Sequence, residues 1–253
     1  MKHFQLIKLL VSRDLTMRYK RSAIGIGWTL LNPMLTSFVL WVVFSFVFAG
    51  KLPNGGQYAP YLMAGIILNS FFNQGLMNSA DSIASNAGIL TKIYVAPQIF
   101  PISVALASLV NFFIGLIPLT IVVYISGQSL SLTFPLVIIV GFFLVLLVAG
   151  LGLSLSLLFI RFEDTKSVIG VLLMILTYLT PIFYPVSILN KDIQYIVNLN
   201  PLTSYLDCFR WAFSNNATAT VGDWLYMGFT GIFAMLFGTF IFRKFWPRTV
   251  AML

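Results

Sequence analysis

The chain has 253 residues, of which 59% are apolar and only 9% charged, and its net charge is +8. Soluble domains carry about 25% charged residues, so this composition excludes a water-soluble globular protein. A bilayer core of about 30 Å needs about 20 mostly apolar residues per helix. The long apolar runs therefore predict an all-α, polytopic membrane protein with six transmembrane helices in a single domain, 1–253.

The first segment, residues 1–22, combines apolar residues at helical spacing with six Lys and Arg residues. This pattern predicts an amphipathic helix at the cytoplasmic leaflet. A cleaved signal peptide is disfavoured, because the apolar run that follows is long and has no small-residue cleavage site after it.

Six spans follow in chain order. They are expected at about 28–49, 58–79, 100–124, 135–160, 167–180 and 224–242. The turn 51–57 separates the first two, and Pro118 should kink the third. Pro181 and Pro185 should break the chain where the fifth ends.

The distribution of Lys and Arg predicts the orientation. With the N-terminus inside, the inside segments hold twelve of these residues and the outside segments hold three. This imbalance places both termini in the cytoplasm. Since the positive charges lie at span ends, they act as topology signals, and no nucleic-acid partner is expected.

The segment 81–98, between the second and third spans, is long enough for a short cytoplasmic helix capped by Ser85 or Asn86. We expect such a helix to dock a cytoplasmic partner, although an ordinary loop is the alternative. The candidate contact residues for an ATPase are Ser85, Asn86, Ile89, Leu90, Lys92 and Tyr94.

The segment 186–221 is too apolar for a plain loop. Ser187 and Asn200 are each placed to cap a short helix. Helices of about 12–14 residues reach about 20 Å and cannot cross a bilayer. They should dip into the membrane from the outer face and return, or else lie flat on the outer leaflet.

Several kinds of chemistry are missing from the sequence. It has no Walker A motif, no metal-type cluster and one histidine, His3. The lone Cys208 excludes an internal disulfide. The seven acidic residues all fall at span ends or in loops, whereas ion-coupled transporters place ionisable groups inside the membrane. If the chain transports a substrate, a separate ATPase is the simplest energy source, and neither metal nor cofactor is expected in the chain itself.

Aromatic and amide side chains are concentrated in the first, second and fifth spans. Aromatic faces suit sugar C–H surfaces and amides suit hydroxyls, so these residues could line a channel for a neutral, hydrated polymer. The channel-lining candidates are Phe38, Trp41, Phe44, Phe48, Asn69, Asn73, Tyr178, Phe183 and Tyr184. The alternative is that the aromatics face lipid or pack, and that the amides join helices.

Residues 18–33, RYKRSAIGIGWTLLNP, resemble the R-Y-K-x-S-x-L-G-x-x-W-x-x-x-x-P signature of permease subunits of ABC transporters that export O-antigen, capsule and teichoic-acid polymers. Weaker similarities follow at 89–101, at 178–185 (YLTPIFYP) and at 198–202 (NLNPL). The chain departs from the family at 161–164, where RFED replaces the usual R-D directly after the fourth span.

The resemblance implies an ATP-driven exporter of lipid-linked polysaccharide, with O-antigen the expected cargo, in the bacterial inner membrane. It implies a homodimer with two ATP-binding-cassette subunits that bind ATP and Mg, and a substrate carried on undecaprenyl pyrophosphate. It also implies a gate helix at 1–22, a coupling helix in 81–98 and outer gate helices in 186–221.

The basic residues near the first span could attract the pyrophosphate head group, since guanidinium forks match phosphate oxygens. These candidates are Arg13, Arg18, Lys20 and Arg21. Anchoring to anionic lipid is the alternative. Two other functions stay open at this point: an ABC permease for a drug or small lipid, and a membrane enzyme acting on lipid-linked sugars.

Overall fold

The computed structural model describes residues 2–19, 25, 27–48, 52, 57–90, 95–214 and 219–250. This part of the chain is helical and contains no strand. The longer helices are α1 (Lys2–Tyr19), α2 (Gly27–Phe48), α3 (Tyr58–Asp81), α5 (Ile99–Ile125), α6 (Val137–Arg161), α7 (Thr165–Leu179), α8 (Lys191–Leu199), α9 (Pro201–Phe213) and α10 (Val221–Thr249). Shorter elements are η2 (Ala84–Asn86), α4 (Ala87–Leu90), η3 (Phe134–Leu136) and η4 (Val186–Ile188).

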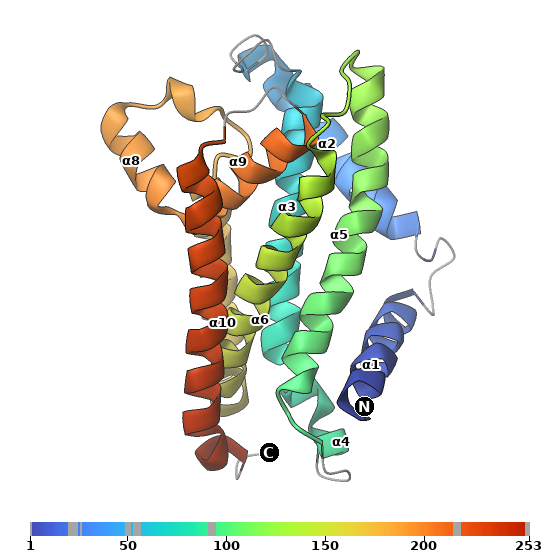
Figure 1. Ribbon diagram of the computed structural model, residues 1–253, viewed down its shortest axis with the longest axis vertical. Helices are drawn as coiled ribbons and strands as arrows, with labels where there is room; N and C mark the ends of the chain where they lie inside the picture. Colours follow the sequence, from blue (N-terminus) through green and yellow to red (C-terminus); the bar gives the residue numbers. More distant parts are fainter. Residues whose placement is uncertain are drawn as a thin grey trace.

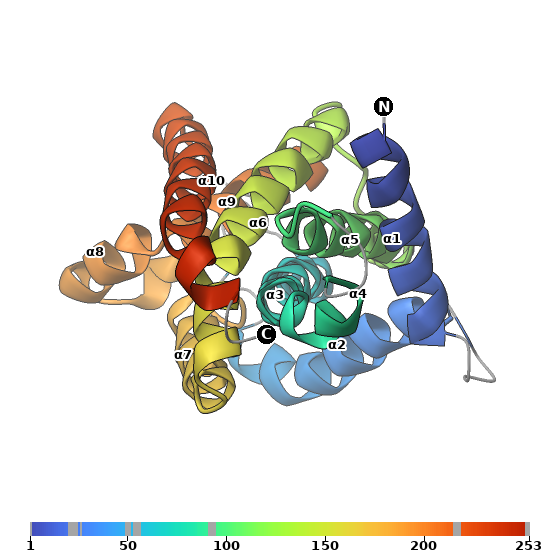
Figure 2. The same cartoon turned by 90° about the horizontal axis from the view of Figure 1, so that it is seen from below.

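Helix α3 lies at the centre of the bundle, with α2, α5 and α6 around it (Figure 2). Its side chains Leu62, Met63 and Leu68 are almost fully buried. Helix α10 packs along α6, and α1 packs beside α5. The core is therefore built around the helix that carries both amide channel candidates, Asn69 and Asn73.

Different helices lie at the two ends of the bundle. The N-terminus, α4 and the C-terminus lie at the lower end in Figure 1, and α8 and α9 lie at the upper end. The apolar stripe of α1, which includes Leu6, Ile7 and Leu10, contacts Ile83 and Phe100 at the lower end. Helix α1 thus packs against the bundle through the face that its spacing predicted to be apolar.

Within the described residues, four helical stretches are long and apolar enough to cross a membrane, at 30–48, 99–125, 134–161 and 221–249. The chain is therefore a multi-pass membrane protein. Helix α3 has the length to cross, at 24 residues, but its amides and serines make it less apolar. Helix α7 has only 15 residues, which reach about 22 Å at a rise of about 1.5 Å per residue.

The segment before α10 contains two short helices, as expected, but only one starts as predicted. Asn200 caps α9, since its side-chain oxygen accepts a hydrogen bond from the Leu202 amide at 3.0 Å. The prediction for Ser187 was wrong. Ser187 lies inside η4, and α8 begins after Asn190 without a side-chain cap.

Candidate functional site

Aromatic side chains form a continuous row from α7 to α3. Its members, in order of contact, are Tyr178, Phe183, Phe44, Phe48, Tyr58 and Tyr61. Neighbouring ring centroids lie 5.9 to 6.3 Å apart, within the range in which aromatic pairs attract each other. This aromatic row joins α7, α2 and α3, and it contains four of the predicted channel residues.

The remaining aromatic candidates are Phe38, Trp41 and Tyr184, and only Tyr184 lies beside this row. Phe38 and Trp41 pair with each other at 6.2 Å on the exposed face of α2. The Tyr184 hydroxyl donates to the carbonyl of Tyr178 at 3.1 Å. The structure therefore places Tyr184 next to the row and leaves Phe38 and Trp41 on a separate part of α2.

The chain after α7 is not helical, and side chains from α3 and α9 satisfy its carbonyls. Arg210 donates to the carbonyls of Pro181 at 3.0 Å and Ile182 at 3.2 Å. The Tyr58 hydroxyl donates to Phe183 at 2.7 Å. The single hydroxyl hydrogen of Tyr61 is shared between the carbonyls of Tyr184 at 2.8 Å and Pro181 at 3.1 Å. Irregular backbone survives in a membrane protein only where its polar groups are satisfied in this way.

Arg210 is the centre of this arrangement. Its side chain is buried, with the residue only 4% exposed. The guanidinium carbon lies 3.4 Å from the centre of the Tyr61 ring, and a third hydrogen bond reaches the Tyr61 carbonyl at 3.1 Å. Asn200 adds a bond to Thr180 at 2.8 Å. One buried charge thus fastens α9 to α3 and to the segment 180–184.

The two amide candidates in α3 contact a hydroxyl on α7. Asn73 donates to the Thr177 hydroxyl at 2.9 Å, and that hydroxyl donates to Asn69 at 3.2 Å. These bonds hold α3 against α7. The amides therefore act as helix-joining groups in this structure, which is the alternative that the sequence left open for them.

A cavity of about 430 Å³ opens at the same upper end. Tyr61, Arg210 and Asp207 lie in its wall. Asp207 belongs to α9, which is too short to span a membrane. Burial, with a smaller contribution from nearby Asp223, raises the pKa of Asp207 to about 7 against the opposing effect of Arg210.

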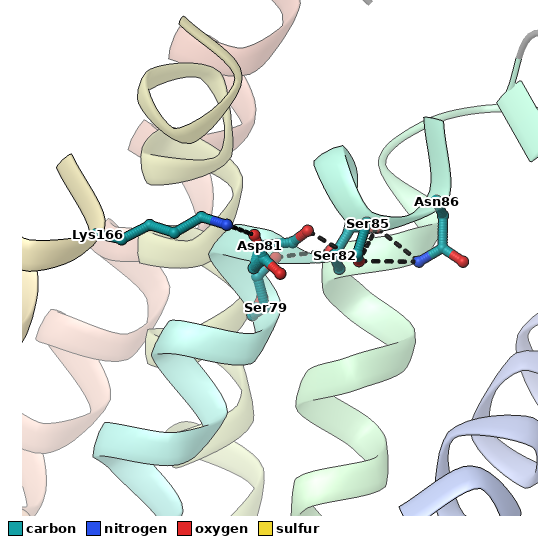
Figure 3. Close-up of polar contacts among 6 residues, drawn as sticks. All are labelled: Ser79, Asp81, Ser82, Ser85, Asn86 and Lys166. Atoms are coloured by element: carbon teal, nitrogen blue, oxygen red, sulfur yellow. Dashed lines mark hydrogen bonds and ion pairs between the residues drawn. The ribbon is translucent and has the colours of Figure 1, made fainter. Parts of the chain in front are cut away.

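A polar cluster lies at the opposite end, where α3 leads into η2 (Figure 3). Lys166, at the start of α7, forms an ion pair with Asp81 at 2.5 Å. Ser85 donates to the carbonyl of Asp81 at 3.0 Å and Asn86 to that of Ser82 at 2.7 Å. We call these residues, together with Arg13, the lower polar cluster.

Arg13 connects α1 to this cluster. Its guanidinium donates to the side-chain oxygen of Asn86 at 2.6 Å. Ser85 and Asn86 bond back toward α3, and Asn86 directly precedes α4. They form a tight 3-10 turn, and the helix that follows it, α4, has only four residues.

The structure describes the side chains of only some of the other coupling and head-group candidates. Ile89 and Leu90 pack against the buried cluster that includes Leu10 and Ile83. Arg18 belongs to α1, but its side chain is not among those described. Lys20, Arg21, Lys92 and Tyr94 lie outside the described residues.

Tyr58, Tyr61 and Arg210 were not predicted as site residues. Arg210 is one of the three Lys and Arg residues that the predicted topology places outside, and it was given no other role. The available signal was a single arginine within a 13-residue apolar helix, since an unpaired buried charge is costly and must find partners. Its partners are backbone carbonyls, which leave no trace in residue identity.

Comparison with known proteins agrees with this architecture. The family model described as "ABC-2 type transporter" matches residues 5–214. An O-antigen export system permease protein of Klebsiella pneumoniae is 27% identical over 95% of this chain and 92% of its own length. An O-antigen export system permease protein of Myxococcus xanthus is 28% identical over 81% and 78%. The polysialic acid transport protein of Escherichia coli is 23% identical over 81% and 80%.

The matched region runs from α1 through α9 and so includes both the lower polar cluster and the aromatic row. The match covers far more than half of the chain. The chain therefore belongs to the ABC-2 type transporter family, as one of its membrane-spanning permease subunits.

Proposed function

We propose that this chain is the permease of an ATP-driven exporter that moves polysaccharide, with O-antigen as the cargo class, across the cytoplasmic membrane. The observation that carries this proposal is the similarity to O-antigen export permeases over nearly the full length of both chains. ATP and Mg would bind to a separate ATPase subunit. The absence of ionisable side chains from the interiors of the expected spans supports this division of labour.

In this proposal six segments span the membrane: α2, α3, α5, α6, α10, and α7 together with the non-helical residues that follow it. The lower end, with α1 and α4, faces the cytoplasm, because Lys and Arg are concentrated there. Helices α8 and α9 form the outer gate segment and enter the membrane from the outer face. The buried position of Arg210 and the satisfied carbonyls of 180–184 support this placement of α9.

The channel would run between two copies of the chain. The membrane-length part of α2 is only 6% buried, and Phe38, Trp41 and Tyr178 are exposed. A second copy could cover part of these faces and leave the aromatic row at the passage. Aromatic rings there would let sugar faces slide past without tight binding.

At the cytoplasmic end, the substrate's pyrophosphate head group, carried on an undecaprenyl lipid, would meet the basic residues of 1–22. Arg13 is already bonded to Asn86. A head group that attracts Arg13 would therefore pull on the segment 81–98, where the ATPase is proposed to dock. The lower polar cluster gives this segment its connections to α1 and α7.

Deletion of the gene tests the proposed function. Surface polysaccharide should disappear and lipid-linked polymer should accumulate inside the cell, and the wild-type gene should restore export. Normal surface polysaccharide in the deletion strain would instead favour a permease for a drug or small lipid. Catalysis by the purified chain alone on lipid-linked sugars would favour the enzyme alternative.

Lys166→Met tests the coupling role of the lower polar cluster. The pair with Asp81 is partly exposed, at 44% and 37%, so its loss should cost at most about 1 kcal/mol of stability. We expect normal protein levels and ATP hydrolysis, but several-fold less polymer exported per ATP. Lys244→Met, an exposed lysine on α10, is the control.

The charge-reversed pair, Lys166→Asp with Asp81→Lys, should recover much of the lost export. If the reversed pair behaved like Lys166→Met, the connection between α3 and α7 would not be what matters. Equal export by Lys166→Met and Lys244→Met would contradict the coupling role altogether.

A further inference from the structure

The cavity at the upper end has the size and lining of a ligand site. Its volume of about 430 Å³ lies within the range of about 300–1,000 Å³ typical of small-molecule pockets. Apolar walls include Ala64 and Phe213, and polar groups converge on the same space. Tyr61 lies in the wall of this cavity and also ends the aromatic row.

Two polar groups of this cavity have hydrogen-bonding capacity to spare. The Nε atom of Arg210 is buried and has no hydrogen-bond partner among the described residues. No hydrogen bond is found for the Asp207 carboxyl in the same part of the chain. Buried polar groups are otherwise nearly always paired. The Nε atom lies enclosed in the wall, whereas the Asp207 carboxyl, three positions away in α9, is not fully buried and lies at the cavity.

The charged side chains in the cavity wall limit which kind of ligand can bind there. An anion would meet Asp207 and Asp223, and a cation would meet the guanidinium of Arg210. A neutral molecule with hydroxyl groups avoids both conflicts, since a hydroxyl can donate to Asp207 and accept from an amide of the same wall. The amides of Gln57, Gln128 and Asn198 add further partners for hydroxyls.

We propose that this cavity is a saccharide subsite, which holds a sugar unit of the exported polymer at the outer mouth of the permease. The inference rests on the proposed function and specifies where, within one subunit, the polymer is recognised on its way out. Asp207 is an electrostatic neighbour of the buried Arg210, but the hydrogen bonds of that guanidinium go to three carbonyls. The carboxyl of Asp207 therefore keeps its hydrogen-bonding capacity for a ligand.

The test uses the permease with its ATPase in nanodiscs. The probe is the host's own surface polysaccharide, cleaved from its lipid and fractionated to short oligosaccharides. Binding is followed by the fluorescence of Trp211 and Trp224, whose rings are 6.0 Å apart and which adjoin Arg210 and Asp223 in sequence. We expect a saturable change with wild type and no change with polyethylene glycol.

Asp207→Leu should weaken this binding by about tenfold or more, because it removes the carboxyl at similar side-chain size. Asp207→Asn keeps hydrogen-bonding atoms and should lose less. Asp192→Leu, on the exposed surface of α8 at the same end, is the matched control. Membrane abundance and melting temperature of each variant establish that it is folded.

Equal binding by Asp207→Leu and wild type would overturn the subsite, as would an equal response to polyethylene glycol. So would the absence of saturable binding to a wild-type complex that exports polymer in cells. That last result leaves the proposed function standing. Normal surface polysaccharide in a deletion strain would instead remove the proposed function itself.

Discussion

Arg210→Met should be among the most damaging single substitutions in this permease. Removal of the guanidinium abolishes hydrogen bonds to the carbonyls of Tyr61, Pro181 and Ile182. Hydrogen bonds to charged groups contribute about 1.5–3 kcal/mol each, and the three buried carbonyls would also be left without this donor. We expect a loss of about 3–5 kcal/mol, which is much of a typical protein's stability.

The measurements are the melting temperature of purified permease, its abundance in the membrane, and surface polysaccharide. Arg210→Lys keeps the charge but not the planar fork, so it should recover only part of the loss. Tyr61→Phe removes the hydroxyl bonds to Pro181 and Tyr184 and should be milder. Arg243→Met, on an exposed arginine of α10, should change little. A normal melting temperature for Arg210→Met would show that the segment 180–184 is held by other contacts.

The sequence predicts the helical architecture well because hydrophobic length is a strong signal. The third predicted span, 100–124, coincides with α5 within a residue at either end. The capping role of Asn200 is also confirmed, since an Asn-Pro pair before an apolar stripe is a specific helix start. The sequence also predicts a span at 58–79, which corresponds to the central helix α3. Its amides keep it out of the four most apolar stretches, so this span is a weaker prediction from hydropathy.

The residues around segment 180–184 were less predictable, because the hydrogen bonds of Tyr58, Tyr61 and Arg210 are accepted by backbone carbonyls. The aromatic row contains four expected residues, but Tyr58 and Tyr61 were missed, as was Arg210. Carbonyls of residues 181–184 determine where these three side chains bond, and no residue pattern records a carbonyl's direction. Ser187 failed as a cap for a related reason: its segment forms a 3-10 turn, and a serine at such a turn resembles a serine at a helix start.

Glycines at the contact of α6 with α10 allow an approach that larger residues would prevent. A Cβ atom added to Gly238 would overlap the carbonyl oxygen of Gly150, and one added to Gly150 would overlap the carbonyl of Ala234. The obstacles are backbone atoms, which cannot rotate away as a side chain can. Small residues at such contacts are the usual means by which membrane helices approach closely.

Gly238→Ala should therefore destabilise the permease, although alanine favours helix over glycine by about 1 kcal/mol elsewhere. Overpacking costs about 1–3 kcal/mol when side chains can adjust, and we expect at least the upper end here, because two helices must separate. Gly228→Ala on the same helix is the matched control. Its added Cβ would lie 3.6 Å from the Phe143 ring, an ordinary contact.

The melting temperature of the purified permease should fall for Gly238→Ala and stay level or rise for Gly228→Ala. Surface polysaccharide should follow the same order, since α10 would no longer seat against α6. If both variants melted alike, the close contact of the two backbones would be wrong. If Gly238→Ala kept its melting temperature but lost export, the contact would matter for movement between α6 and α10 and would contribute little to folding.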